Sequence, residues 1–279
     1  MLSYRHQFHA GNFADVFKHA LLTRLLLALN KKAKPYFYLD THAGVGRYDF
    51  THPWAQKVRE YESGITKLWD RTDTPESLKP YLDAVRRENP DGKLRFYPGS
   101  PRIARGMIRP IDRIALTELN KTDCSELHLL FARDPRVTVK LMDAVQGLKA
   151  HLPPKERRGL VLIDSSFDVA GEFARLAGAL AMAHKRWATG TYAIWYPLMG
   201  AGVIRGFERA LADTGIRNVL QFEFSILPED ASTIPGCGMI IVNPPWKFDT
   251  EMRTMLRWMW PILSINGAGG VKVEWLARE

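Results

Sequence analysis

The stretch YFYLDTHAGVGRY, residues 36–48, decides the fold. Its first five residues form a short apolar run that ends in an acid, which predicts a buried strand. Two glycines, Gly44 and Gly46, then allow the backbone to turn tightly and to approach a ligand closely. Ligands of open α/β sheets bind beyond the carboxyl ends of the strands. By itself, the loop fits a ligand site and a tight turn that binds nothing equally well.

Six further apolar runs repeat this pattern along the chain. We expect strands at residues 113–118, 137–141, 159–164, 191–196, 219–227 and 239–243. Helical patterns lie between them, for example at 125–133 and 172–186. Short apolar strands that alternate with helices predict an α/β fold built on a mostly parallel, doubly wound sheet.

Two segments lie outside this alternation. Residues 49–97 are rich in charged and aromatic side chains and predict two or three amphipathic helices. We interpret them as a helical insertion subdomain after the first strand, within a single domain that spans residues 1–279. Near the N-terminus a helix is expected over residues 12–30, with Asn12 as its N-cap and Asp15 at the positive end of its dipole.

Composition limits the class of protein. The chain has 279 residues, of which 46% are hydrophobic and 25% charged, and these are ordinary globular values. Two cysteines are too few for a disulfide framework, and no apolar run approaches the roughly 18 residues of a spanning helix. We therefore expect a cytoplasmic protein with no membrane segment and no metal. The net charge of +9 favours a polyanionic partner, although many basic proteins bind no nucleic acid.

Acidic residues follow four of the expected strands: Asp40, Glu118, Asp143 and Asp164. At neighbouring carboxyl ends they would ring one cleft. A carboxylate at Glu118 can accept both hydroxyls of a ribose, and one at Asp143 can accept an adenine amino group. Four carboxylates would repel a phosphate, whereas S-adenosylmethionine has no phosphate and carries a sulfonium cation. Each acid alone also fits a helix N-cap, but the four together favour S-adenosylmethionine.

Several longer motifs carry a resemblance to a known family. They are YRHQFHAGNFADVFKH at residues 4–19, LDTHAGVGRY at 39–48, YPGSP at 97–101, ATGTYAIWYP at 188–197 and GMIIVNPPW at 238–246. On these motifs nearly the whole chain resembles the bacterial 23S rRNA (adenine-N6)-methyltransferase family. The resemblance implies a Rossmann-like class I methyltransferase fold, S-adenosyl-L-methionine as the cofactor and 23S ribosomal RNA as the partner.

The resemblance also implies roles for individual residues. Cofactor contacts fall on Lys18, His19, His42, Gly44, Ser100, Glu118, Asp143, Ala144 and Asp164. Tyr4 corresponds to a residue that handles the RNA base, and His42 is the histidine that we favour as functional. The implied catalytic group is Asp164 with the backbone carbonyl of Ser165, both accepting hydrogen bonds from the adenine amine. Phe167 is expected to stack on the flipped base.

The chain departs from the family at two places. Ala144 stands where the family has glycine, and Asp164-Ser165-Ser166-Phe167 stands where it has Asp-Pro-Pro-Tyr. The carboxylate and an aromatic face remain, whereas the stiffness of two prolines and a tyrosine hydroxyl are lost. An active enzyme is therefore expected, with a catalytically weakened or inactive RNA-binding relative as the alternative. A DNA adenine-N6 methyltransferase is a second alternative, although no separate target-recognition domain is apparent.

A second motif, Asn243-Pro244-Pro245-Trp246, matches the amino-methyltransferase pattern better than residues 164–167 do. It comes after the sixth and seventh expected strands, so we interpret it as a rigid loop that ends an antiparallel strand, with Trp246 near the cleft. Basic residues of the insertion could follow an RNA backbone or could simply form a solvated helix face. They are Arg86, Arg87, Lys93 and Arg95. A monomer is expected.

Overall fold

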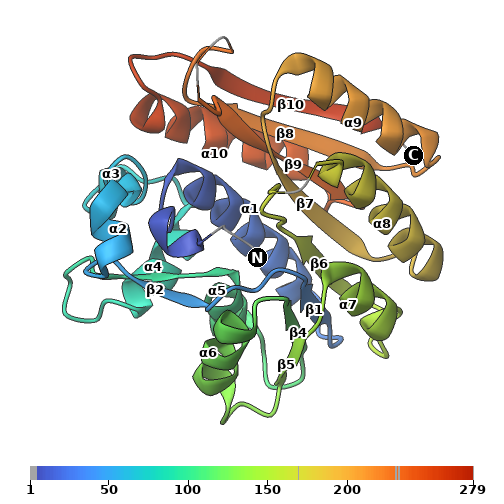
Figure 1. Ribbon diagram of the computed structural model, residues 1–279. Helices are drawn as coiled ribbons and strands as arrows, with labels where there is room; N and C mark the ends of the chain where they lie inside the picture. The colour runs from blue at the N-terminus through green and yellow to red at the C-terminus, as the bar shows by residue number, and fades with distance from the viewer. Residues whose placement is uncertain (1–4, 169, 230, 232, 279) are drawn as a thin grey trace.

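A computed structural model describes residues 5–168, 170–229, 231 and 233–278. Within this part of the chain, eight strands form one sheet in the order β10-β8-β9-β7-β6-β1-β4-β5 (Figure 1). The strands are β1 Phe37–Asp40, β4 Arg113–Glu118, β5 Val137–Leu141, β6 Gly159–Ile163, β7 Thr191–Pro197, β8 Val219–Ser225, β9 Gly236–Val242 and β10 Gly270–Ala277. The strands β1, β4, β5, β6 and β7 pair in parallel, and β9 is antiparallel to both of its neighbours. The predicted Rossmann-like α/β fold is confirmed.

Helices cover both faces of the sheet, and the side chains of the central strands are accordingly buried and mostly apolar. One face carries α1 Phe13–Asn30, α5 Ser100–Met107, α6 Lys121–Phe131 and α10 Phe248–Leu263. The other carries α7 Ala144–His151, α8 Glu172–Arg186 and α9 Ala201–Asp213. Alternation along β1 divides its side chains between the two cores: Tyr38 packs with the first layer, and Phe37 and Leu39 pack with the second.

The insertion after β1 contains the predicted helices and a small sheet that the sequence did not predict. Its helices are α2 Pro53–Val58, η2 Glu60–Glu62, α3 Thr66–Trp69 and α4 Lys79–Arg87. The strands β2 Arg47–Asp49 and β3 Phe96–Pro98 pair antiparallel at its two ends. Three residues are too few to display a strand period, which explains the omission.

A close backbone contact fixes the N-terminal segment to the insertion. The Ile65 amide donates to the Gly11 carbonyl at 2.9 Å. A Cβ at Gly64 would lie 2.1 Å from the same oxygen, so only glycine allows this approach. The predicted cap of α1 is confirmed as well, because the Asn12 side chain accepts from the Asp15 amide at 2.9 Å. The N-terminal segment is thereby held above the sheet edge where β1 ends.

The Asn243–Trp246 loop lies at the opposite edge of the sheet. It follows β9, which runs antiparallel to β7. The side-chain Nδ2 of Asn243 donates to the carbonyls of Ala188 and Gly190 just before β7 begins. The prediction of a loop ending an antiparallel strand is confirmed. The expectation that Trp246 packs near the cleft is wrong, because that side chain is 89% exposed and lies at the amino ends of the parallel strands.

Candidate cofactor and catalytic site

The structure brings the four predicted acids to the same end of the sheet, where the carboxyl ends of the parallel strands lie. Asp40 ends β1, and its register partners are Leu116 of β4 and Leu162 of β6. Glu118 ends β4, Asp143 follows β5, and Asp164 follows β6. Because β6, β1, β4 and β5 are neighbours, the acids stand on strands about 4.8 Å apart.

The expectation that Asp40 lines the cleft with the other three acids is wrong, because Asp40 is buried behind the glycine loop. Its carboxylate is fully buried and accepts from the Tyr38 hydroxyl at 2.9 Å and from the His42 amide at 3.3 Å. Burial raises the pKa of Asp40 to about 6, in spite of these hydrogen bonds and one from Ser100. Asp40 therefore positions the start of the loop, and Ser100 supports Asp40 from the first residue of α5.

This raised pKa predicts a dependence of stability on pH. Since the folded protein favours neutral Asp40, this contribution to stability is complete below about pH 4 and is lost as the pH rises through 6. The free energy of unfolding should fall by about 2 kcal/mol from pH 4 to pH 7 on account of this one group. Urea denaturation of the parent and Asp40→Asn across that range measures the difference. Parallel pH profiles for the two proteins would contradict the prediction.

Glu118 and the glycine loop hold each other in place. One Glu118 oxygen accepts from the Gly44 amide at 2.8 Å and the other from the Asn120 amide at 2.8 Å. Gly44 has φ +58°, and a Cβ there would meet the Tyr48 hydroxyl at 2.7 Å, so the predicted tight turn requires glycine. Burial raises the pKa of Glu118. Each of its oxygens keeps a lone pair for a further donor.

Asp143 is both a site residue and a helix cap. Its Oδ1 accepts from the Gln146 amide at 2.9 Å, which is the helix N-cap that the sequence also allowed for each acid. Ala144 is the first residue of α7 and does not have a positive φ. Alanine therefore fits the backbone at a position where the resembled family carries glycine.

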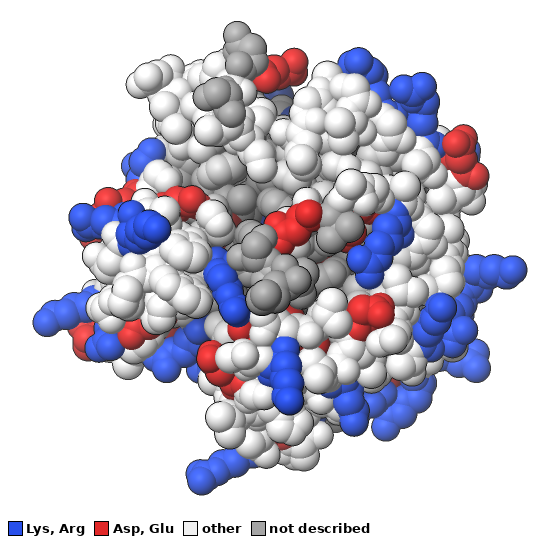
Figure 2. Space-filling model, viewed as in Figure 1, with Lys and Arg blue, Asp and Glu red and all other residues white. Residues whose placement is uncertain are grey.

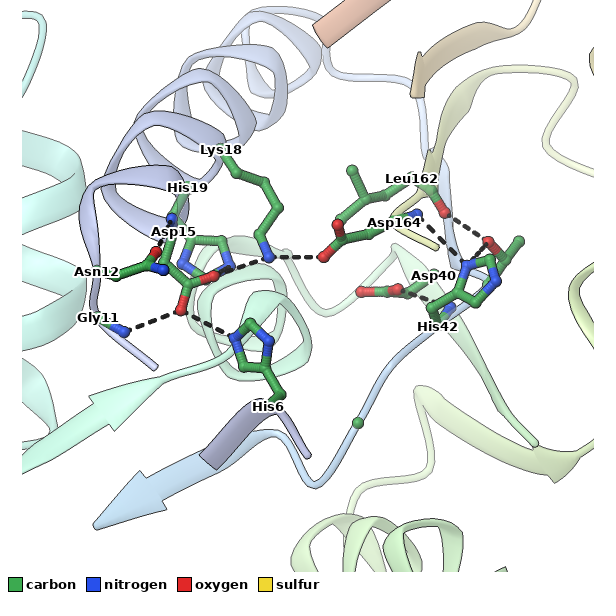
Figure 3. Close-up of polar contacts among 12 residues, drawn as sticks. His6, Gly11, Asn12, Asp15, Lys18, His19, Asp40, His42, Leu162 and Asp164 are labelled. Carbon is green, nitrogen blue, oxygen red and sulfur yellow. Dashed lines mark hydrogen bonds and ion pairs between the residues drawn. The ribbon is translucent and has the colours of Figure 1, made fainter. Parts of the chain in front are cut away.

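A buried chain of charges leads to Asp164 (Figure 3). The Lys18 ammonium donates to Asp164 Oδ2 at 2.6 Å and to Asp15 Oδ1 at 2.8 Å. Asp15 Oδ2 accepts from the Gly11 amide and lies 2.9 Å from His6 Nε2. Burial alone would lower the pKa of Lys18, but the charges of Asp15 and Asp164 outweigh burial and hold it well above its usual value. The N-terminal turn η1, His6–Phe8, is thus connected to the carboxylate at the end of β6.

Sequence reasoning missed this role of Asp15, which was expected only to suit the helix dipole. Asp15 is 2% exposed and Lys18 is 4% exposed. Burial would raise the pKa of Asp15, yet its contacts with His6 and the Lys18 ammonium hold it well below its usual value. The signal was an acid and a base three residues apart on an otherwise apolar helix face.

Two histidines flank the chain of charges. Burial lowers the pKa of His42, so its ring is neutral near pH 7. Its Nδ1 accepts from the Asp164 amide at 3.4 Å and lies 2.9 Å from the Thr41 hydroxyl. His19 is 1% exposed, burial lowers its pKa to about 3, and its Nδ1 contacts the Tyr97 hydroxyl at 2.8 Å. Among the described residues His19 Nε2 has no hydrogen-bond partner, an orphaned polar atom that a bound polar ligand would satisfy.

The Asp164–Phe167 segment is tied to α8. The Ser165 hydroxyl donates to Glu172 at 2.6 Å, which supplies a tether where the resembled family has proline. Phe167 adopts φ +56°, a strained conformation for a bulky side chain. Its half-buried ring lies 4.7 Å from that of Phe173 and 6.0 Å from that of Trp195. Backbone strain of this kind is typical of functional loops.

Three further predictions concern Tyr4, metal binding and membrane segments. Tyr4 lies outside the described residues. In the described ranges, no group of three or more His, Cys, Asp and Glu side chains could hold a metal ion. No helix of those ranges is both long enough and apolar enough to cross a membrane.

Comparison with known proteins gives consistent matches. The family model described as "Ribosomal RNA large subunit methyltransferase D, RlmJ" matches residues 33–277. Two proteins named ribosomal RNA large subunit methyltransferase J are similar over 100% of both chains: that of Escherichia coli K12 is 43% identical, and that of Haemophilus influenzae Rd is 44% identical. A crystal structure of a Legionella pneumophila protein is 35% identical, with a TM-score of 0.89 over 96% of this chain and 98% of its own.

Proposed function

The chain belongs to the ribosomal RNA large subunit methyltransferase family RlmJ, and on that premise we propose that it methylates N6 of an adenine in 23S rRNA. It is an S-adenosylmethionine-dependent rRNA methyltransferase of the Rossmann-like class. The proposal extends this to the reacting atom and to the residues that act on it. We further propose one domain over residues 1–279, with the insertion at 49–97, that acts as a cytoplasmic monomer.

The observation that carries the proposal is the Lys18–Asp164 contact at the end of β6. An exocyclic amine is a poor nucleophile because its lone pair is conjugated with the ring. Lys18 holds Asp164 Oδ2, so Oδ1 is left to accept a hydrogen bond from the amine as positive charge develops on nitrogen. The Ser165 carbonyl accepts the second amine hydrogen. S-adenosylmethionine, when bound, supplies an electrophilic methyl group.

The donor and acceptor set around the loop fits this cofactor. Glu118 would accept hydrogen bonds from the ribose hydroxyls of the cofactor with its remaining lone pairs. Asp143 Oδ2 would accept a hydrogen bond from the amino group of the cofactor's adenine. His19 Nε2, which is buried and has no hydrogen-bond partner among the described residues, would bond a polar group of the cofactor. The remaining proposed contacts come from elements that surround the same loop: Lys18, His42, Gly44, Ser100, Ala144 and Asp164.

Replacing Glu118 by glutamine should weaken S-adenosylmethionine binding by about 10- to 100-fold. The amide keeps the size of the side chain but offers one acceptor where the carboxylate offers two, and hydrogen bonds to a charged group contribute about 1.5–3 kcal/mol. Titration calorimetry with S-adenosylhomocysteine measures the dissociation constant. Glu126→Gln, on the exposed side of α6, is the matched control and should bind as the parent does.

RNA is proposed to approach the face where the acids meet. Figure 2 shows red side chains near the centre of the view, with blue side chains around them and at the periphery. Phe167 would stack on the target base, and Tyr4 is proposed to contact the RNA. The overall charge of +9 favours the phosphate backbone.

Methylation of a protein-free 23S rRNA fragment tests the proposal. Nuclease digestion and mass spectrometry should find N6-methyladenosine in the product, and a DNA hairpin of the same sequence should be a poor substrate. Cofactor binding without any turnover would favour the inactive RNA-binding relative. Preference for the DNA hairpin would favour a DNA methyltransferase.

A further inference from the structure

A second concave site lies at the carboxyl ends of α4, α5 and α6, outside the cofactor site. The cavity has a volume of about 340 Å³. Four arginines line it: Arg87, Arg102, Arg105 and Arg133. The uncharged part of its wall comes from Ala84, Gly106, Leu130 and Phe131. The helix α4 belongs to the insertion. The helices α5 and α6 pack on the main sheet and lie next to one another in Figure 1.

Two carboxylates in the cavity are already occupied. Glu88 is 9% exposed and is held by Arg47 Nε at 3.1 Å and Arg102 Nη2 at 2.7 Å. Asp134 is held in the same manner by Arg105 and by Arg136, whose Nη2 lies 2.8 Å away. Each acid is therefore shared between two guanidinium groups and leaves positive charge uncompensated.

Two further arginines add to this charge. Arg87 and Arg133 are exposed and form no ion pair with any residue in the described ranges. The guanidinium of Arg87 faces Gly106, because a Cβ built on that glycine would lie 3.4 Å from Arg87 Nη2. Gly106 has no side chain, so the space next to the Arg87 guanidinium is left unfilled.

We propose that this cavity binds backbone phosphates of the RNA substrate, an inference that rests on the proposed rRNA methyltransferase function. A guanidinium fork matches two phosphate oxygens, and several forks around one concavity suit a phosphodiester chain better than a single small anion. The site is connected by one helix to the end of β1. The helix α5 runs from Ser100, beside Asp40, to Gly106 in the cavity, a rise of about 9 Å.

A double substitution removes the unpaired charge without disturbing an ion pair. Arg87→Ala/Arg133→Ala should raise the dissociation constant for a 23S rRNA fragment about tenfold at moderate salt. The slope of log affinity against log salt should become less steep by about 1.5, since each phosphate contact contributes about 0.7–0.9. Fluorescence anisotropy with labelled RNA measures both quantities. The KM for RNA should rise while kcat and the dissociation constant for S-adenosylhomocysteine stay at parent values.

The matched control is Arg205→Ala/Arg209→Ala on α9, which removes the same charge from the opposite face of the sheet. It should keep the salt slope of the parent. Gly106→Glu offers an independent test, because it adds a carboxylate to the cavity at a helical position where glutamate is well tolerated. It should weaken RNA binding, whereas Gly178→Glu on the exposed side of α8 should not.

Parent-like affinity and salt slope in both cavity variants would overturn the inference and leave the arginines as partners of the helix carboxyl ends alone. Equal losses in the cavity variants and the controls would also overturn it, since the effect would then be one of net charge. A parent protein that binds RNA but methylates none would contradict the proposed function while the binding assay still tests the cavity.

Discussion

Replacing Asp164 by asparagine should lower kcat for RNA methylation by about 10²- to 10³-fold, the cost of losing one preorganised charged group at the reacting centre. The amide has nearly the same shape, so the loop and its tether from Ser165 to Glu172 should persist. The amide also places an N–H donor near the amine and gives Lys18 only a neutral oxygen. Single-turnover methylation at saturating RNA and cofactor measures the chemical step directly.

The downstream motif provides the control for this prediction. Asn243→Gly keeps the left-handed backbone at φ +54° and removes only the side chain that bonds Ala188 and Gly190. Because the loop lies at the far edge of the sheet, activity should change by less than about twofold, while the free energy of unfolding falls by about 1–2 kcal/mol. Loss of turnover in Asn243→Gly with normal turnover in Asp164→Asn would reverse the assignment.

Local patterns were sufficient to predict the frame of the site. A buried parallel strand appears in sequence as a short apolar run, and the acid after each run must lie at the carboxyl edge of the sheet. The strand and loop at residues 36–48 therefore placed the glycine turn and, with three later strands, the four acids. The edge strand β10 was missed because only one of its residues, Val273, is buried, so its pattern is not that of a core strand.

Contacts between distant segments could not be predicted in this way. Lys18 and Asp164 are 146 residues apart, and nothing local to either residue indicates that α1 crosses the end of β6. The prediction for Trp246 failed although the antiparallel direction of β9 was expected, because that direction puts residues 243–246 beside the start of β7, at the end of the sheet away from the four acids. Such features follow from sheet topology, which short-range periodicity leaves open.

The serine pair of the catalytic segment shows how a departure from a family motif can be accommodated. Prolines stiffen a loop by restricting the unfolded chain, whereas here the Ser165 hydroxyl fixes the loop through Glu172 at the start of α8. The Phe167 ring adds contacts with Phe173 and Trp195. The loop therefore keeps a defined path without either proline, which is consistent with an active enzyme.

Replacing Lys18 by methionine should lower the free energy of unfolding at pH 7 by about 3–5 kcal/mol, because it leaves Asp15 and Asp164 without their shared cation. Methionine matches the length of the apolar stem, so lost packing contributes little. Urea denaturation followed by circular dichroism measures the loss. Lys185→Met, at an exposed position of α8, is the control and should stay within about 0.5 kcal/mol of the parent.

The dependence of this deficit on pH separates charge from packing. Without Lys18, burial of Asp15 is poorly compensated, so the folded pKa of its carboxyl should rise above the unfolded value. A raised carboxyl pKa costs stability as the pH increases, so the deficit of Lys18→Met should be largest at pH 7 and should shrink toward pH 4. Adding Asp15→Asn should restore part of the loss at pH 7. The deficit could instead be constant across this range and unchanged in the double variant. That result would mean that Lys18 stabilises the fold through packing, and that its ion pairs with Asp15 and Asp164 contribute little to stability.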